Sequence, residues 1–152
     1  RDGAVVSGAL GLRYAPVDRV HVTGRYRYKD KHADEDFEAF TEHRVRADAL
    51  YVLDRGVTLS GQTHVALRDY DDADPFVSRT ETRDDTEYFA RLGVSVSLDR
   101  IAATLGTSLP KTVTDNFQVN LFGQYRNVDS NLPNFDYDNY RAEFSVSKRF
   151  AF

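Results

Sequence analysis

The sequence predicts an all-β protein, an antiparallel transmembrane up-and-down β-barrel with about seven visible strands. Three observations predict this fold. Apolar and polar residues alternate with a period of two in seven segments, short turns alternate with long polar stretches, and acidic residues gather in those stretches while basic residues lie in the segments. Period-two alternation is typical of a strand with two different faces.

Each predicted strand is recognised by its own alternation. The seven segments cover residues 6–14, 19–29, 43–53, 57–68, 87–98, 117–126 and 139–152. In the second segment, Val20, Val22 and Tyr26 share one face, and Arg25 and Arg27 share the other. Roughly ten residues suffice for a tilted strand to cross a bilayer, so each segment is long enough to do so.

The other six segments repeat this division into an apolar and a polar face. The apolar faces of the first, third and fourth segments contain Leu10, Leu12 and Tyr14, then Val45, Ala47 and Tyr51, then Val57, Leu59, Val65 and Leu67. Those of the fifth, sixth and seventh contain Tyr88, Leu92 and Val94, then Phe117, Val119 and Leu121, then Tyr140, Ala142, Phe144 and Val146. The opposite faces are rich in Arg, Ser, Thr and Gln, which suits a water-filled or plugged lumen.

The connections between the predicted strands are short and long in turn. The short ones, residues 15–19 and 53–56, contain the turn formers Pro16 and Gly56. The long ones are polar and cover residues 30–43, 69–87 and 127–139. This order is that of a barrel with periplasmic turns and extracellular loops. Residues 99–116 fall on the short-turn side, where we expect a small helix or an extended turn.

Charge is distributed unevenly between these parts. The three long stretches hold 17 of the 24 acidic residues but only three of the 20 lysines and arginines. Basic residues on the polar faces of the predicted strands are Arg13, Arg25, Arg27, Lys29, Arg44, Arg46, Arg68, Arg91, Arg126, Arg141 and Arg149. A lumen lined by them would concentrate anions. Equally, they would pair with Asp48, Glu143 or carboxylates of other strands and brace the wall.

A soluble β-sandwich or lipocalin-like barrel would also show alternation, and it stays open as an alternative. Its polar face would be bathed in water and mixed in the sign of its charges, whereas basic residues prevail here. Aromatic residues support a membrane location, because six tyrosines fall near predicted strand ends, where an aromatic girdle is expected. These are Tyr26, Tyr28, Tyr51, Tyr88, Tyr125 and Tyr140.

Composition excludes several classes of protein. The chain has no cysteine, so neither disulfides nor thiolate metal sites are available. No run approaches the 18 apolar residues of a transmembrane helix. Nucleic acid is not an expected partner, because the net charge is −4 and the aromatic residues lie on apolar faces.

An enzyme is not expected, and neither is a cofactor. Ser60 and His64 share a polar face but lie about 13 Å apart along a strand, too far for a direct hydrogen bond. The acidic run Asp69, Asp71, Asp72 and Asp74 offers weak candidate ligands for Ca²⁺ or Mg²⁺. It lacks the glycine and the distal glutamate of an EF-hand loop, so a solvated loop is the preferred interpretation.

The last residues carry a resemblance to a known class of proteins. The sequence "NYRAEFSVSKRFAF" ends on Phe152, with Phe150, Val146 and Phe144 at alternating positions before it. It resembles the C-terminal signal of Gram-negative outer-membrane barrels, which the barrel-assembly machinery reads. The resemblance implies an integral protein of the bacterial outer membrane, surrounded by lipid and lipopolysaccharide. Lys148 departs from the pattern, since that position is usually apolar, although a long side chain can snorkel.

The last 70 residues, 83–152, carry a narrower resemblance. They resemble the final strands of surface lipoprotein assembly modifiers and of proteobacterial β-barrel porin families, mainly through the loop "DSNLPNFDYDNYR". The first family implies transfer of lipoproteins to the cell surface, usually with a periplasmic helical-repeat domain ahead of the barrel. It also implies a periplasmic or surface protein partner.

Together these observations predict one outer-membrane β-barrel domain over residues 1–152, incomplete at its N-terminus. Bacterial single-chain barrels have even strand numbers, so seven strands are expected to be the C-terminal part of a larger barrel. The expected function is passage or export across the outer membrane, as a porin-like channel or as the barrel of a surface-export system. The alternative is a non-conducting scaffold barrel that sheathes or anchors a partner.

Overall fold

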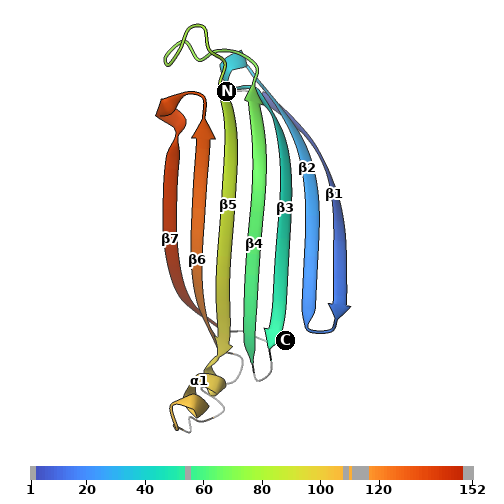
Figure 1. The fold of residues 1–152 in the computed structure, drawn as a ribbon, viewed down its shortest axis with the longest axis vertical. Helices are drawn as coiled ribbons and strands as arrows, with labels where there is room; N and C mark the ends of the chain where they lie inside the picture. The colour runs from blue at the N-terminus through green and yellow to red at the C-terminus, as the bar shows by residue number, and fades with distance from the viewer. Residues whose placement is uncertain (1–2, 54–55, 108–109, 111–116, 149–152) are drawn as a thin grey trace.

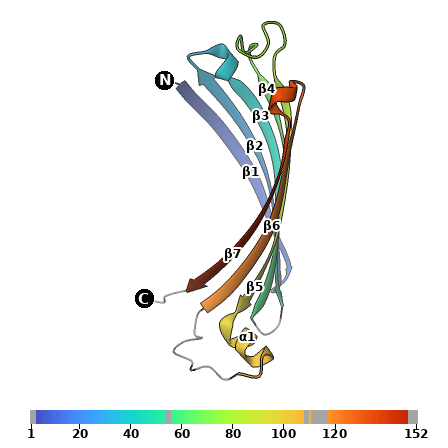
Figure 2. The same ribbon diagram turned by 90° about the vertical axis from the view of Figure 1, so that its left-hand side faces the viewer.

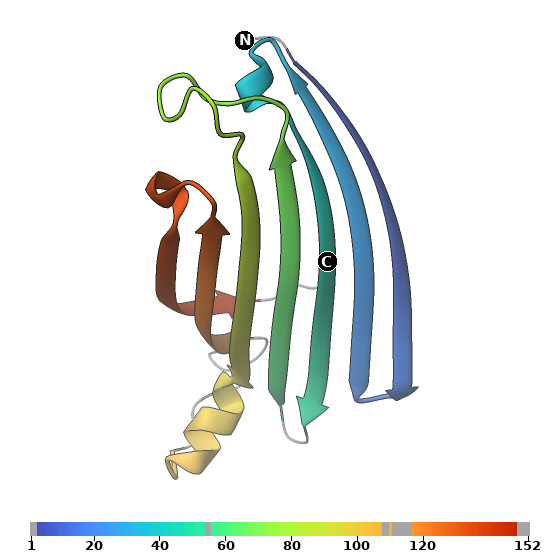
Figure 3. The ribbon, with the colours of Figure 1, turned by 45° about the horizontal axis from the view of Figure 1, so that its top comes forward.

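The computed structural model describes residues 3–53, 56–107, 110 and 117–148 and contains one antiparallel sheet. Seven strands follow one another in chain order, each hydrogen-bonded to the next (Figure 1). They are β1 Gly3–Val17, β2 Val20–Ala33, β3 Phe40–Leu53, β4 Val57–Tyr70, β5 Asp84–Ser97, β6 Phe117–Ser130 and β7 Tyr137–Lys148. The predicted seven up-and-down antiparallel strands are therefore confirmed. The described sheet is open, with β1 and β7 as its two edges (Figure 3).

In the described residues, three short helices lie at the ends of the strands. The 3-10 helices η1 (Asp36–Glu38) and η2 (Pro133–Phe135) lie in the connections between β2 and β3 and between β6 and β7. Helix α1 (Leu98–Thr104) follows β5 at the opposite end of the sheet, with the short turns (Figure 1). A small helix or an extended turn was predicted within residues 99–116, and α1 covers the start of this stretch, while 108–109 and 111–116 lie outside the described residues. In the described part of the chain, none of the helices has the length and apolar character needed to span a membrane.

The strands are longer than the alternation predicted, which corrects the expected loop boundaries. The connections predicted at 30–43, 69–87 and 127–139 shrink to 34–39, 71–83 and 131–136. The physical reason is that pairing continues beyond the apolar segments: Lys29 pairs with Glu42 across β2 and β3, and Arg68 pairs with Asp85 across β4 and β5. Glu42 and Asp85 were predicted in loops but lie within strands, and Glu87, predicted at the boundary of loop and strand, lies three residues inside β5.

The apolar face of the sheet is more exposed than the polar face, which is the reverse of the usual arrangement in a protein dissolved in water. Figure 2 shows the sheet from the side as a single curved layer. Apolar side chains of the convex face are open: Leu10 is 77% exposed, Leu92 72% and Phe144 67%. The buried side chains of the strands, among them Glu42 and Glu87, instead belong to the polar, concave face. In the described part of the chain, no second layer covers the apolar face.

Strand register aligns the apolar side chains into a continuous band. Leu10, Tyr26, Val45, Val65 and Tyr88 lie opposite one another from β1 to β5. Every side chain of this row points to the convex face, because residues directly opposite in an antiparallel pair share one face.

The six tyrosines predicted to form an aromatic girdle lie on this convex face, but the expectation that they fall near strand ends is wrong for several of them. β2 continues from Tyr26 to Ala33, and β6 continues from Tyr125 to Ser130. Beyond the tyrosines, the convex face becomes polar, with Asp30 next to Thr41 in register. The tyrosines thus mark the edge of the apolar band and the strands extend past it.

A glycine on the concave face makes room for an aromatic ring. Gly93 on β5 lies directly opposite Phe122 on β6. A Cβ atom at Gly93 would lie 2.2 Å from Phe122 Cδ1 and 2.8 Å from Ser60 Oγ, far inside van der Waals contact. The Phe122 ring therefore covers the Gly93 backbone, and any side chain at position 93 would displace it.

We predict that Gly93→Ala lowers the free energy of unfolding by about 2 kcal/mol, because overpacking forces Phe122 out of its position. The measurement is a urea titration of the protein in detergent micelles, followed by circular dichroism. Gly11→Ala is the matched control, since a Cβ atom there meets only Gly24 O, at an ordinary 3.5 Å. Equal stabilities of the two variants would contradict this account of Gly93.

Candidate functional site

The concave face is dominated by positive charge. Ten of the eleven predicted basic residues lie on it, and Arg149 lies outside the described residues. In the described strands, the carboxylates on the same face are Glu42, Asp48, Asp85, Glu87 and Glu143. Basic side chains therefore outnumber carboxylates, and the arrangement of the carboxylates decides which of the basic groups are neutralised.

Glu42 on β3 is the first of two carboxylates around which arginines gather. Its side chain is 2% exposed, and it accepts hydrogen bonds from Arg27 at 2.6 Å, Arg44 at 3.1 Å and Arg68 at 2.7 Å. Arg27 and Arg44 lie directly opposite each other across β2 and β3, where like charges repel. Glu42 offsets this repulsion because it contacts both guanidinium groups.

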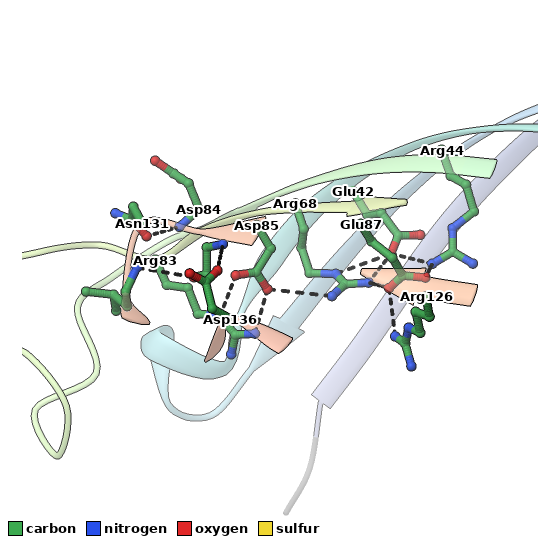
Figure 4. Close-up of polar contacts among 12 residues, drawn as sticks. Glu42, Arg44, Arg68, Arg83, Asp84, Asp85, Glu87, Arg126, Asn131 and Asp136 are labelled. Carbon is green, nitrogen blue, oxygen red and sulfur yellow. Dashed lines mark hydrogen bonds and ion pairs between the residues drawn. The ribbon is translucent and has the colours of Figure 1, made fainter. Parts of the chain in front are cut away.

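Glu87 on β5 is the second such carboxylate. His64 Nε2 lies 2.7 Å from Glu87 Oε1, and Arg126 donates to Oε2 at 2.7 Å. Arg68 Nη2 lies 3.7 Å from Glu87 and 2.7 Å from Glu42, so this guanidinium joins the two carboxylates. Figure 4 shows the resulting chain of contacts between strands β3, β4, β5 and β6. We call Glu42, Glu87, Arg27, Arg44, Arg68, Arg126 and His64 the concave-face network.

The network continues toward the loop end of the sheet. Asp85, whose side chain is fully buried, accepts two hydrogen bonds from Arg83, and Arg68 Nη1 lies 3.8 Å from it. The Arg83 guanidinium also lies over the Phe135 ring, 3.6 Å from its centroid. Asn131 accepts a hydrogen bond from the Asp84 backbone N–H and so ties the loop after β6 to the start of β5.

Bracing of the sheet is the role that these contacts support directly. Small buried side chains, Ala66 and Val128, lie in the same rung as Glu87 and leave room for the larger groups. The pairings with Asp48 and Glu143 that the sequence suggested are also present. Arg46 donates to both Asp48 oxygens, and Glu143 lies 3.5 Å from Arg91 and 3.6 Å from Arg141.

Sequence reasoning missed Glu42 because it was assigned to a loop, and it missed Glu87 because this residue was placed at the boundary between a loop and a strand. The signal that finds them is the continued alternation: Glu42 has the same parity as Arg44 and Arg46, and Glu87 the same parity as Arg91. Residues of equal parity in one strand share a face. The acidic ends of the predicted strands were therefore part of the polar face rather than of the loops.

Two predicted arginines stand apart from these contacts. Arg13 on β1 and Arg25 on β2 are exposed, and among the described residues neither has a carboxylate within ion-pair distance. Arg13 lines a hollow of about 520 Å³ on the concave face, on the short-turn side of the network. The other side chains of the concave face that line it are His21, Thr23, Asp48, Leu50, Ser60, Gln62, Arg91 and Phe122.

The remaining predicted positions take other places. Asp69 lies in β4, while Asp72 and Asp74 accept hydrogen bonds from the backbone N–H groups of Ala73 and Phe76 in the following loop. The described residues contain no group of three or more metal-binding side chains.

The structure also locates part of the predicted assembly signal and the pair formed by Ser60 and His64. Phe144 and Val146 lie on the convex face, exposed at 67% and 54%, whereas Phe150 and Phe152 lie outside the described residues. His64 contacts Glu87 rather than Ser60.

No family model, no curated protein and no solved structure matches this chain. The resemblances of its C-terminal segments therefore stay predictions.

We predict that Glu42→Gln lowers the free energy of unfolding by about 3 kcal/mol, because three guanidinium groups lose their shared counter-charge. The measurement is again a urea titration in detergent micelles. Glu143→Gln is the matched control: Glu143 is 37% exposed and its two arginines lie at 3.5 and 3.6 Å. Its loss is expected to cost less than about 1 kcal/mol. A cost for Glu42→Gln no larger than this would contradict a bracing role for the network.

Proposed function

We propose that this chain forms part of the wall of an integral outer-membrane β-barrel that mediates passage or export across that membrane. The observation that carries the proposal is the reversed polarity of the sheet. Apolar side chains such as Leu10 and Leu92 are exposed on the convex face, whereas charged side chains such as Glu42 and Glu87 are buried on the concave face. A lipid environment outside and water inside satisfy both faces at once.

The size of the apolar band supports a bilayer as its cover. On β4 the band runs from Leu67 to Val57. Those ten residue steps correspond to about 33 Å along the strand, or about 25 Å along the barrel axis for a tilt of about 40–45°. That height matches the outward apolar band of outer-membrane barrels. A continuous exposed band of this extent is unusual for a protein dissolved in water.

The two free edges support a wall larger than the seven described strands. β1 and β7 are the first and last of seven alternating strands, so they run in the same direction. Backbone groups left unpaired in lipid cost several kcal/mol each, so both edges need partners in the membrane. An antiparallel neighbour for each edge requires an odd number of additional strands, which makes the total even, as is usual in bacterial barrels.

The charge of the concave face supports transport of solutes through the lumen of such a barrel. In the concave-face network, Glu42 and Glu87 pair with Arg27, Arg44, Arg68 and Arg126, so they offset half of the charge of these arginines and brace the wall. Basic groups still exceed carboxylates on this face, which would favour anions over cations in the lumen. A wide barrel also needs such bracing, because its interior has no packed apolar core.

The experiment that tests the proposal is reconstitution of the native protein, extracted with detergent, into planar bilayers. Discrete conductance steps with a reversal potential favouring anions would support the channel. Insertion without conductance would favour the non-conducting scaffold barrel that sheathes or anchors a partner. A protein that stays in solution after the detergent is removed would overturn the membrane location itself.

We predict that Leu92→Arg destabilises the protein in lipid vesicles by about 2–4 kcal/mol, because the new charge would face the acyl chains. The matched control is Ser95→Arg, three residues along β5 on the concave face, which is expected to be tolerated. The fraction of each variant that floats with vesicles in a density gradient is the measurement. Equal flotation of both variants would contradict the assignment of the convex face to lipid.

A further inference from the structure

We infer that the hollow lined by Arg13 and Arg91 is a binding site for a small hydroxylated organic anion, such as a sugar acid. This inference rests on the proposed function, because it names the class of solute that the concave face would recognise. The hollow lies on the short-turn side of the concave-face network and has a volume of about 520 Å³. That volume lies in the range of ordinary small-molecule sites, about 300–1,000 Å³.

Strand register brings the charged and polar groups of the hollow into one row. Arg13, Thr23, Asp48, Gln62 and Arg91 lie opposite one another in sequence from β1 to β5. All five belong to the concave face, because side chains of directly paired residues share a face. Arg13 on β1 and Arg91 on β5 both line the same hollow, and the sheet between them is curved (Figure 2).

The two arginines retain donors for an anion. Among the described residues, Arg13 has no carboxylate within ion-pair distance. Arg91 is 3.5 Å from Glu143, which also serves Arg141 at 3.6 Å, so neither contact is short. A guanidinium has five N–H donors, and a carboxylate or phosphate takes two of them at once.

The carboxylate in the row does not repel such a ligand as strongly as its charge suggests. Asp48 receives hydrogen bonds from Arg46 Nε and Nη2, at 2.8 and 2.6 Å, so its charge is compensated from outside the hollow. The Asp48 side chain is 35% exposed, so its oxygens are open to hydroxyl donors of a ligand. The hollow therefore combines a positive balance of charge with a hydroxyl acceptor.

The rest of the lining fits the body of a hydroxylated molecule. Thr23, Ser60 and Gln62 offer neutral donors and acceptors to the hollow. Phe122 adds an apolar ring to the lining, and the Arg91 guanidinium lies over this ring, 4.3 Å from its centroid. A sugar acid has one anionic group, several hydroxyls and an apolar C–H face, and the hollow provides a counterpart for each.

The test is isothermal titration of the native protein in detergent with gluconate, inorganic phosphate and glucose. Gluconate has both the charge and the hydroxyls, phosphate has only the charge and glucose only the hydroxyls. We expect saturable binding of gluconate, with clearly weaker binding of the other two. Equal affinity for gluconate and phosphate, or no saturable binding of gluconate, would overturn the inference.

Single substitutions distinguish binding of gluconate in the hollow from a general attraction of anions to the basic concave face. Arg13→Gln and Arg91→Gln are each expected to weaken gluconate binding by about tenfold, the loss of one charge-assisted pair. Arg25→Gln is the matched control, because Arg25 is also exposed and, among the described residues, has no carboxylate within ion-pair distance, but it does not line the hollow. An equal loss of affinity in Arg25→Gln would overturn the site in favour of a diffuse field.

Failure of this inference is distinguishable from failure of the proposed function. Flotation of the unaltered protein with lipid vesicles is measured independently and reports only on the membrane location. Protein that floats but binds no gluconate overturns the site alone. If Arg13→Gln lowers the free energy of unfolding and leaves gluconate affinity unchanged, Arg13 braces the wall and the site is also overturned.

Discussion

The constraint on which the whole structure depends is the reversed polarity of a single-layer sheet. The described chain has no second layer to cover its apolar face, and its few buried apolar side chains include Ala39, Ala66 and Val128. Hydrophobic burial within the chain is therefore too small to hold a curved sheet of seven strands in water. Backbone pairing and contacts among charged groups maintain the sheet, and in the proposed function the bilayer supplies the cover that the convex face lacks.

Placing the charges inside creates a second requirement, which the concave-face network meets. Arginines directly opposite each other across two strands repel, as Arg27 and Arg44 do, unless a carboxylate lies between them. Glu42 fills that role, and Arg68 joins it to Glu87. The network lies toward the loop end of the sheet, and Arg13 lies on its short-turn side. Arg25 lies level with the network residues His64 and Arg126. Among the described residues, neither Arg13 nor Arg25 has a carboxylate within ion-pair distance. The concave face is thus divided into a braced part and a part that keeps free donors.

The sequence alone was sufficient for the strand order and for the assignment of each side chain to a face, because period-two alternation is a local property. It was insufficient for strand ends. Polar residues at both faces of β2 and β3 beyond Tyr28 look like a loop, but cross-strand pairs such as Lys29 with Glu42 keep them in the sheet. Glu42 was placed in a loop for the same reason. Neither the pairing of Arg68 with Glu42 nor the isolation of Arg13 was predictable, since both depend on contacts between strands.

The measurement that tests the central claim most directly is a spin-label scan along β5, which the absence of native cysteine makes practical. Single cysteines are introduced from Thr86 to Val96, labelled, and placed in lipid vesicles. Accessibility to oxygen, which concentrates in lipid, and to a water-soluble nickel complex is then compared. The account predicts period-two alternation, with oxygen favoured at the even-numbered positions, such as Tyr88, Leu92 and Val94, and nickel favoured at the odd-numbered positions. Equal access of the nickel complex to both faces would contradict it.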